Sequence, residues 1–263
     1  MVVGVKGSGV GRTDNDNGND NVNGKYSGNV NGNAMSVPNH IAFIMDGNRR
    51  WAQKNKLKLF GHRQGMQKFE DVLDWCLELG VPHTSAYVLS TENLKRPKEE
   101  LDEIFDVALD FLKRFEKKKP IFDKYEVNVR FVGDLSKLPP KLVKLMRKIM
   151  QSTAKYQKKA LNILVGYGSR FELTQAMRKI AQKAIEKGRI EISEREINKN
   201  LLVPVPIDLI IRTGGMSRLS NLMLWQASYA ELIFLNVLWP DFTKKNLIWC
   251  IKEYNRRQRN FGK

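Results

Sequence analysis

The sequence contains few cysteines and no long apolar run, and each absence excludes a class of protein. Two cysteines, Cys76 and Cys250, are too few for a disulfide framework, and they lack the spacing of metal ligands. No stretch of about 18 apolar residues is present, which argues against a membrane-spanning helix. The first residues also lack the basic and apolar regions of a secretory signal. We therefore expect a protein of the reducing cytoplasm.

The formal net charge of +17 indicates an anionic partner. Residues 1–36 hold as many basic as acidic side chains, so the whole excess lies in the remainder of the chain. Such a field attracts nucleic acid, anionic lipid headgroups or phosphorylated small molecules, and charge alone does not choose among them. A nucleic-acid-binding protein needs a recognition motif or a basic face interleaved with stacking aromatics. The sequence has neither, so we expect no nucleic-acid partner.

Composition divides the chain into two parts. Residues 1–36 are dominated by glycine and asparagine and contain few large apolar side chains, so they cannot offset the entropy lost on folding. We predict a disordered extension over 1–36 and one folded domain over 37–263, a length that suits a single α/β unit.

Within 37–263, short apolar runs alternate with amphipathic segments. The runs are apolar nearly throughout, as in strands that are covered on both faces. The pattern predicts a mostly parallel central sheet of about six strands flanked by helices. Ser169 with Glu172, and Ser193 with Glu196, match capping boxes at two helix starts. The predicted strands are 41–45, 84–89, 127–132, 161–165, 207–211 and 232–235, and the predicted helices are 63–79, 97–116, 140–158, 169–187, 193–200 and 244–258.

Three predicted loops combine a flexible backbone with arginine and amide side chains. Residues 46–51, 90–97 and 212–221 follow strands, and parallel sheets bind ligands beyond the carboxyl ends of their strands. Flexible backbone with guanidinium donors is suited to phosphate oxygens. Taken singly, Asp46-Gly47 would be an ordinary turn and His62 an ordinary packing histidine. The loops contain no Walker A sequence, dinucleotide fingerprint, serine nucleophile elbow or clustered metal ligands.

Five segments in order resemble the signature segments of cis-prenyltransferases, the undecaprenyl-diphosphate-synthase-like enzymes. The resemblance extends from about residue 37 to the closing RNFG (259–262), and five co-linear motifs make it specific. The segments are HIAFIMDGNRRWA (40–52), GHRQG (61–65), STENLKRP (90–97), IRTGG (211–215) and RLSNLMLWQASYAEL (218–232).

The resemblance implies a fold, a reaction and partners. The family fold is a mostly parallel sheet with helices around a hydrophobic tunnel, usually as a homodimer. The implied reaction is a Mg²⁺-dependent transfer of prenyl groups. Isopentenyl diphosphate is added repeatedly to farnesyl or geranylgeranyl diphosphate, which makes a long-chain cis-polyprenyl diphosphate. Because the product is a long hydrocarbon and the surface is basic, we also expect peripheral contact with anionic membranes.

Roles for individual residues follow from the same resemblance. Asp46 matches the acid that holds Mg²⁺, and Glu231 matches a second acid that supports the metal, in some members across the dimer interface. Asn48 and Asn93 are candidates for assisting proton loss, so the predicted catalytic residues are Asp46, Asn48 and Asn93. Substrate contacts are predicted for Gly47, Asn48, Arg49, Arg50, Trp51, Lys58, His62, Ser90, Thr91, Glu92, Asn93, Arg96, Arg212, Arg218 and Ser220.

Some positions depart from the bacterial family pattern. Arg49 stands where glycine is usual, and Met216 and Ser217 replace an acid and a histidine. The resemblance also leaves open an alternative function, that of a non-catalytic partner subunit in a hetero-oligomeric cis-prenyltransferase, which has the fold but has lost site residues. Asp46, Glu231 and the matched asparagine, arginine and serine residues are all present, which favours a catalyst instead.

Helix 97–116 carries an unusually broad apolar stripe. The stripe is explained by packing against the sheet, but the matching helix of the family also walls the hydrocarbon tunnel. A small residue, Ala108, lies among large ones and would leave room for a prenyl chain. The stripe consists of Leu101, Ile104, Phe105, Ala108, Leu109, Phe111, Leu112 and Phe115.

Overall fold

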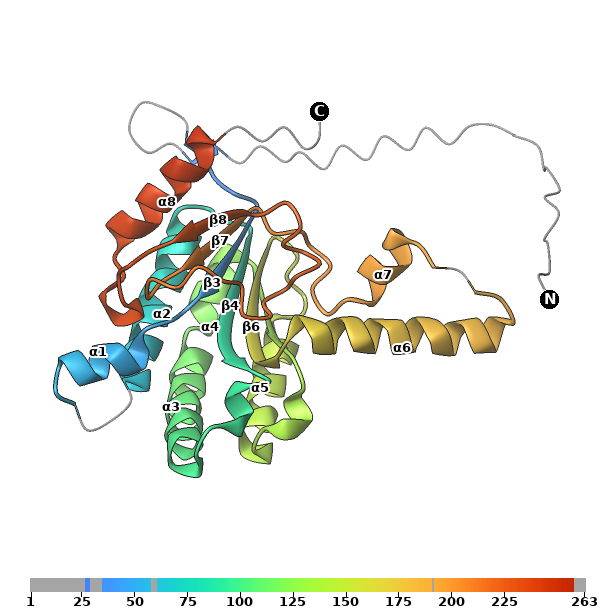
Figure 1. Cartoon of the computed structure of the whole chain (residues 1–263), viewed down its shortest axis with the longest axis horizontal. Helices are drawn as coiled ribbons and strands as arrows, with labels where there is room; N and C mark the ends of the chain where they lie inside the picture. The colour runs from blue at the N-terminus through green and yellow to red at the C-terminus, as the bar shows by residue number, and fades with distance from the viewer. Residues whose placement is uncertain (1–26, 29–34, 58–60, 191, 258–263) are drawn as a thin grey trace, which may run out of the picture.

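The computed structural model describes residues 27–28, 35–57, 61–190 and 192–257 (Figure 1). Most of the predicted extension at 1–36, and Lys58 among the predicted substrate contacts, lie outside the described residues. Within the extension, the short strands β1 (Ser27–Gly28) and β2 (Met35–Ser36) form an antiparallel pair.

The core of the fold is a six-stranded sheet in the order β5-β6-β4-β3-β7-β8. All five neighbouring pairs are parallel, so the predicted α/β class is confirmed. Each predicted strand overlaps an observed one, because β-branched residues favour strands and parallel strands buried on both faces are apolar nearly throughout. The strands are β3 (His40–Ile44), β4 (His83–Ser90), β5 (Val127–Val132), β6 (Lys159–Tyr167), β7 (Leu209–Arg212) and β8 (Glu231–Phe234).

Helices follow the strands, and two of them are absent from the sequence prediction. These are α1 (Asn48–Lys54) and α4 (Lys119–Tyr125), both only seven residues long. Short helices of polar composition carry little periodicity, which explains the omission. The others are α2 (His62–Glu78), α3 (Lys98–Lys117), α5 (Pro140–Thr153), α6 (Ser169–Lys187), α7 (Glu194–Asn200) and α8 (Lys244–Arg256), with 3₁₀ turns η1 (Asn93–Lys95), η2 (Leu135–Lys137) and η3 (Trp239–Asp241).

The sheet separates two apolar layers, and alternation along β3 shows the division. Ile41 and Phe43 join the larger cluster, which packs against α2, α3, α5 and α8. Ala42 and Ile44 point to the opposite side, where Val203, Ile207 and the segment around Leu222 and Met223 cover them. A strand buried on both faces cannot show the polar alternation of a surface strand.

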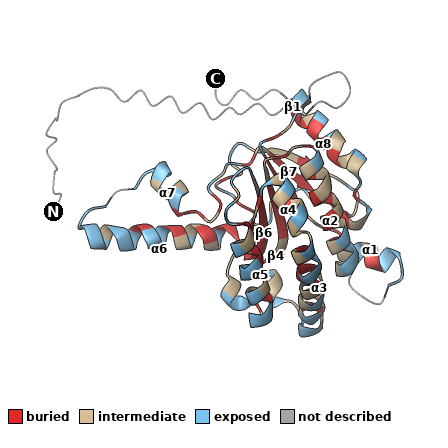
Figure 2. Ribbon diagram, turned by 180° about the vertical axis from the view of Figure 1, so that it is seen from behind, coloured by how far each residue is buried: buried red, intermediate tan, exposed pale blue. Residues whose placement is uncertain are grey.

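Helix α6 leaves the body of the molecule as an arm, with α7 packed beside it (Figure 1). Its buried residues, Ser169, Glu172, Ala176 and Ile180, lie in its first twelve residues, and the remainder is largely exposed (Figure 2). The sequence shows one continuous helical pattern along α6. Only the tertiary structure reveals that its second half extends away from the core.

The capping box predicted at Ser169 is wrong, whereas Ser193 is an observed helix cap. The residue at the N-cap of α6 is Gly168, which has no side chain to cap the helix, and Glu172 is buried. The Glu172 carboxylate accepts hydrogen bonds from Tyr167 Oη at 2.5 Å and from the backbone N–H of Leu202 at 2.8 Å. At α7, Ser193 Oγ accepts from the backbone N–H of Glu196 at 3.2 Å, which is the serine half of the predicted box, while the Glu196 carboxylate accepts from Lys199 Nζ at 3.0 Å.

Candidate functional site

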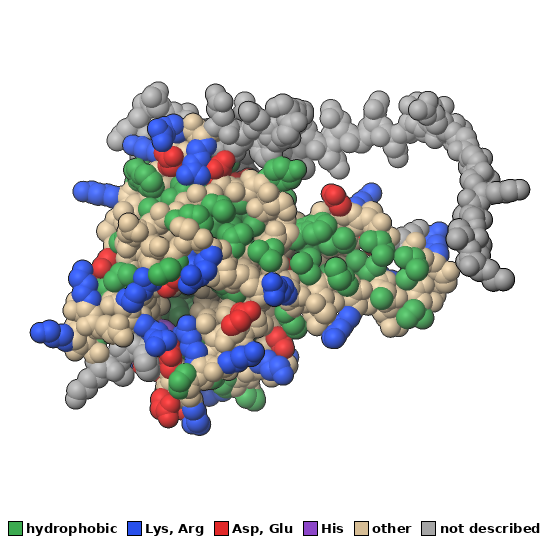
Figure 3. Space-filling model, viewed as in Figure 1, with side chains coloured by type: hydrophobic (Ala, Val, Ile, Leu, Met, Phe, Trp, Pro, Cys, Tyr) green, Lys and Arg blue, Asp and Glu red, His purple; other side chains and the backbone are tan. Residues whose placement is uncertain are grey.

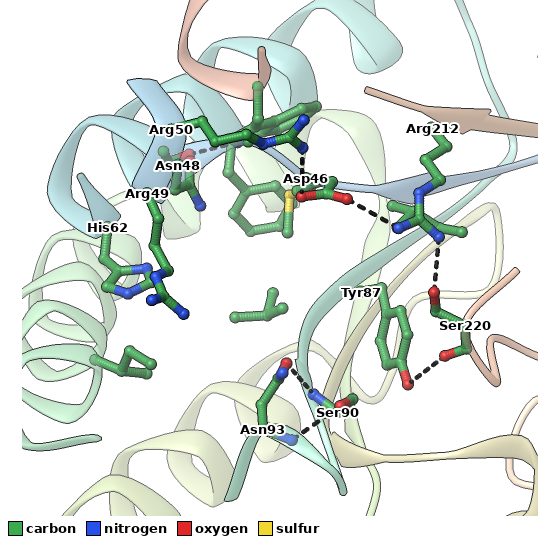
Figure 4. A pocket seen from close by; sticks show the side chains of 18 of the residues that line it. Asp46, Asn48, Arg49, Arg50, His62, Tyr87, Ser90, Asn93, Arg212 and Ser220 are labelled. Carbon is green, nitrogen blue, oxygen red and sulfur yellow. Dashed lines mark hydrogen bonds and ion pairs between the residues drawn. The ribbon is translucent and has the colours of Figure 1, made fainter. Parts of the chain in front are cut away.

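A pocket of about 850 Å³ opens beyond the carboxyl ends of β3, β4 and β7 (Figure 4). The three loops that the sequence singled out meet there, because adjacent parallel strands end at one edge of the sheet. The predicted residues that line the pocket are Asp46, Gly47, Asn48, Arg49, Arg50, His62, Ser90, Glu92, Asn93, Arg96, Arg212, Arg218 and Ser220.

Asp46 lies between two arginines. Its Oδ1 is 3.1 Å from Arg50 Nη2, and its Oδ2 is 2.8 Å from Arg212 Nη2 (Figure 4). The Asp46 backbone is fixed through Thr213, whose hydroxyl donates to the Asp46 carbonyl at 2.8 Å. About 29% of the Asp46 side chain is exposed, so the carboxylate is held rigidly yet can be reached from the pocket.

Arg212 connects Asp46 to the loop after β7. Its side chain is only 4% exposed, and a buried guanidinium is costly unless it is paired. Arg212 Nη2 pairs with Asp46, while Nη1 donates to Ser220 Oγ at 2.7 Å and to the Arg218 carbonyl. The arginine therefore places Ser220 and Asp46 on the same wall of the pocket (Figure 4).

Close packing fixes α1, which carries Asn48, Arg49 and Arg50. Gly47 has a φ of +116°, and a side chain there would also meet Leu238. A methyl group at Gly65 of α2 would lie 2.4 Å from Asn48 Oδ1, so the two helices approach through a glycine. Asn48 Oδ1 is buried and accepts no hydrogen bond within the described part of the chain.

A second basic group of the pocket gathers around Glu100, which sequence reasoning missed. Glu100 is almost fully buried in the first turn of α3. Its carboxylate is 2.9 Å from Arg96, 3.4 Å from His62 and 3.8 Å from Arg49. From the sequence, Glu100 indicates only a helix start, since acids are common in first turns. The structure shows it orienting three of the predicted substrate contacts.

Burial influences the charge of His62. Loss of solvent lowers the pKa of His62 below its ordinary value, and the opposing influence of Glu103 and Glu100 does not cancel this effect. The imidazole is therefore uncharged near neutral pH before an anion arrives.

The loop after β4 is ordered by mutual hydrogen bonds. Asn93 Oδ1 accepts from the Ser90 backbone N–H at 3.1 Å, and Ser90 Oγ accepts from the Asn93 backbone N–H at 3.1 Å. Tyr87, which the sequence did not indicate, also lines the pocket, and its hydroxyl lies 3.3 Å from the Ser220 carbonyl. A tyrosine inside an apolar strand gives no sequence signal of this role.

Among the predicted residues that the structure describes, three are not part of the pocket lining: Trp51, Thr91 and Glu231. The Trp51 indole N–H donates to Asp241 Oδ1 at 2.7 Å, which attaches α1 to η3. The Thr91 backbone N–H donates to the Tyr167 carbonyl at 2.9 Å, and Lys58 lies outside the described residues. Glu231 begins β8 opposite Leu209, whereas Arg212 pairs with Phe234 at the site end. The Glu231 carboxylate is 2.7 Å from Arg257 Nη1. Within one chain, Glu231 is therefore separated from Asp46.

An apolar cavity of about 30 Å³ adjoins the pocket behind α3. It shares Met66, Phe69, Val88 and Ile104 with the pocket, and Ala108 is part of its wall. Leu142 and Met146 of α5 close the other side. A cavity of this size is no open tunnel, so the hydrophobic tunnel stays a prediction.

The described residues include no group of three or more His, Cys, Asp or Glu side chains that could hold a metal ion by themselves. Mg²⁺ is commonly bound by one or two carboxylates together with substrate phosphates and water. The accessible carboxylate of Asp46, in a pocket rich in arginine, fits that mode of binding. Within the described ranges, none of the helices has the length and apolarity needed to cross a bilayer.

Comparisons with known proteins agree on one family. The family model described as putative undecaprenyl diphosphate synthase matches residues 44–262. A tritrans,polycis-undecaprenyl-diphosphate synthase (geranylgeranyl-diphosphate specific) of Methanopyrus kandleri is 44% identical over 86% of this chain and 85% of its own length. An isoprenyl transferase of Thermotoga maritima is 39% identical over 87% and 98%.

Solved structures are similar over the same region. Lavandulyl diphosphate synthase from Lavandula x intermedia, in complex with dimethylallyl diphosphate, superposes with a TM-score of 0.80 at 30% identity, covering 86% of this chain and 99% of that one. A probable undecaprenyl diphosphate synthase from Campylobacter jejuni gives 0.71 at 35% identity, covering 87% and 100%.

Proposed function

The chain belongs to the undecaprenyl diphosphate synthase family of prenyltransferases, and from this we propose that it adds isopentenyl diphosphate units to an allylic diphosphate. The observation that supports this most directly is the placement of Asp46 between Arg50 and Arg212 in a pocket that joins three basic loops. Such a pocket has room and charge for two diphosphates side by side. The proposed product is a long-chain cis-polyprenyl diphosphate.

We assign the allylic diphosphate and isopentenyl diphosphate to different sides of the pocket. Arg49, Arg50 and His62 come from α1 and α2 and would hold the allylic diphosphate. Arg212, Arg218 and Ser220 would hold isopentenyl diphosphate on the opposite side. Asp46 would hold Mg²⁺, which offsets the charge of the leaving diphosphate.

In the proposed reaction, the allylic C–O bond breaks and its electron pair leaves with the diphosphate. The double bond of isopentenyl diphosphate supplies the electrons of the new C–C bond, and a proton is then lost from its second carbon. Asn48 and Asn93 are the polar groups proposed to assist that loss. Asn93 is held by Ser90, so its position is set before substrate binds.

The test is an incorporation assay with the purified chain alone. Labelled isopentenyl diphosphate should enter an extractable polyprenyl product in the presence of Mg²⁺, and a chelator should stop it. Geranylgeranyl diphosphate is the first primer to supply, because the Methanopyrus relative is named as specific for it, and farnesyl diphosphate is the second. A folded chain that incorporates no label alone would instead support the alternative of a non-catalytic partner subunit.

Exposed apolar side chains at the outer end of α6 support a homodimer. Met177, Ile185, Ile190 and Ile192 are 61–78% exposed on or just after α6, and Figure 3 shows apolar side chains gathered over this region. An exposed patch of this kind marks an interaction surface. A second copy of the chain is the proposed occupant, as the family resemblance implies. Glu231 would act at a metal site only if such a partner brought it there.

Light scattering after gel filtration tests the dimer. The wild-type chain should elute as a dimer, and Ile185→Asp should shift it towards monomer because burying a lone carboxylate in an apolar contact is unfavourable. The charge reversal Lys179→Asp on the same helix serves as the control and should remain dimeric. A monomeric wild type, or a dimeric Ile185→Asp variant, would contradict the assignment of this surface.

Peripheral contact with anionic lipid is proposed through α5. Its exposed residues Lys141, Lys144 and Arg147 lie on the outer side of the helix, while Leu142 and Met146 face the apolar cavity. Each basic side chain near an anionic surface contributes about 1 kcal/mol of binding free energy.

Vesicles containing phosphatidylglycerol should carry the protein upward in a flotation gradient, and the bound fraction should fall as salt rises. The triple charge reversal K141E/K144E/R147E should abolish this. Equal flotation with phosphatidylcholine at high salt would instead indicate a hydrophobic attachment.

A further inference from the structure

Asn221 caps the start of α6 from a distant part of the sequence. The backbone N–H of Ser169 donates to the Asn221 carbonyl at 2.8 Å, and that of Arg170 donates to Asn221 Oδ1 at 3.0 Å. These N–H groups belong to the first helical turn, where the helix itself offers no acceptors. The loop that carries Ser220 is therefore fixed to the first turn of α6.

The other end of the Asn221 amide reaches the loop after β4. Its Nδ2 donates to Glu92 Oε1 at 3.0 Å. The orientation of the amide is determined by its neighbours, because one atom faces an N–H donor and the other faces a carboxylate. Asn221 thus joins the loop of Ser220 to the loop that holds Ser90, Glu92 and Asn93, and both loops line the pocket.

The backbone is shaped for this contact. Ser220 and Asn221 have φ values of +50° and +64°, and residues other than glycine adopt this left-handed conformation only at a cost, which is smallest for asparagine and aspartate. A methyl group at Gly168 would lie 2.6 Å from Asn221 Nδ2 and 2.8 Å from Thr91 Oγ1. The glycine leaves the space that the amide occupies between α6 and the loop after β4.

The charge of Glu92 matches the donor it faces. Partial burial would raise the pKa of Glu92, but hydrogen bonds from its own backbone, Ser90 and Asn221 outweigh that effect and lower it. The carboxylate is therefore ionised at neutral pH. An aspartate in place of Asn221 would face it with the same charge, while still accepting the N–H of Arg170.

We propose that Asn221 is a positioning residue for isopentenyl diphosphate. Its amide sets the distance between the loop of Arg218 and Ser220, which would hold the diphosphate, and the loop of Ser90 and Asn93, which would lie beside the reacting carbons. This inference rests on the proposed function. It predicts an effect on one substrate and not on the other, since Arg50 and His62 do not depend on either contact of the amide.

Asn221→Asp is the main test. We expect the KM for isopentenyl diphosphate to rise roughly tenfold, which corresponds to about 1.4 kcal/mol, while the KM for the allylic primer changes little. The melting temperature should not fall, because a carboxylate caps a helix start as well as an amide does. Asn221→Gly keeps the left-handed backbone and loses both side-chain contacts, so it should raise the same KM and lower the melting temperature.

A second substitution, at Glu92, should restore the contact. In the double variant N221D/E92Q, the new amide at position 92 can donate to the new carboxylate at position 221, so the contact is restored with donor and acceptor exchanged. Its KM for isopentenyl diphosphate should be lower than that predicted from the two single variants together. The matched control is Asn198→Asp. Asn198 lies on α7 and accepts from Trp225 Nε1, and aspartate keeps this acceptor, so both KM values should be unchanged.

The outcomes separate this inference from the proposed function. Calorimetry measures the affinity for isopentenyl diphosphate directly, so it tests the role of Asn221 without requiring turnover. An inactive wild-type chain would refute the proposed function, and weaker binding by Asn221→Asp would still support the role of Asn221. Unchanged affinity in Asn221→Asp overturns the inference. It is equally overturned if both KM values and the melting temperature change together, because the residue would then be merely structural.

Discussion

Asp46→Ala should lose at least about 100-fold in turnover, the scale typical of removing one preorganised electrostatic group from an active site. Asp46 is the accessible carboxylate that Arg50 and Arg212 hold in place, so the alanine variant loses the proposed Mg²⁺ ligand. Turnover should remain low at high Mg²⁺, since the metal would have lost its proposed protein ligand on this wall of the pocket.

The structure adds a stability cost that the sequence did not indicate. Arg212 is buried, and removing Asp46 deprives it of its ion pair and leaves the contacts with Ser220 and the Arg218 carbonyl. Loss of a partner of this kind costs about 1–3 kcal/mol. Asp46→Asn is the matched variant, because it retains the shape and one acceptor but not the charge. Both variants should be folded by circular dichroism and nearly inactive. Near-normal turnover in a folded Asp46→Ala protein would refute the assignment.

Ala108→Phe should shorten the polyprenyl products while sparing the first condensation. Ala108 lines the apolar cavity between α3, α5 and the sheet, which adjoins the proposed diphosphate pocket. A phenyl ring exceeds the space available there and would block a hydrocarbon that grows into this region. The diphosphate contacts lie elsewhere, so addition of the first unit should proceed at nearly the wild-type rate. Chromatography of labelled products gives the length distribution.

The competing explanation is that Ala108 only packs against the core. The same substitution would then overfill the core and cost about 1–3 kcal/mol of stability. Leu109→Phe is the control, since Leu109 also packs on the core but does not line the cavity. It should leave product lengths unchanged. A lower melting temperature of Ala108→Phe with unchanged product lengths would exclude the tunnel role for this position.

The loop chemistry of the pocket could be predicted because it depends on neighbours along the chain. Asp46, Ser90 and Arg212 each lie at the end of a recognisable buried strand, and parallel strands bring their carboxyl ends together whatever the details of packing. The same reasoning could have excluded Glu231 from the site within one chain, since it begins its strand. The family resemblance supplied the roles of these residues, and the strand pattern supplied their common location.

Local patterns in the chain were sufficient to predict the α/β class, the six strands and the loops that line the pocket. Apolar periodicity and strand ends are local properties, and they can be read without knowledge of tertiary contacts. Folding produces three further features: the cap of α6 by Asn221, the gathering of basic residues around Glu100 and the exposed half of α6. Each depends on how segments far apart in the chain are placed. The capping box at Ser169 failed for that reason, because a polar partner brought by folding replaced the local one.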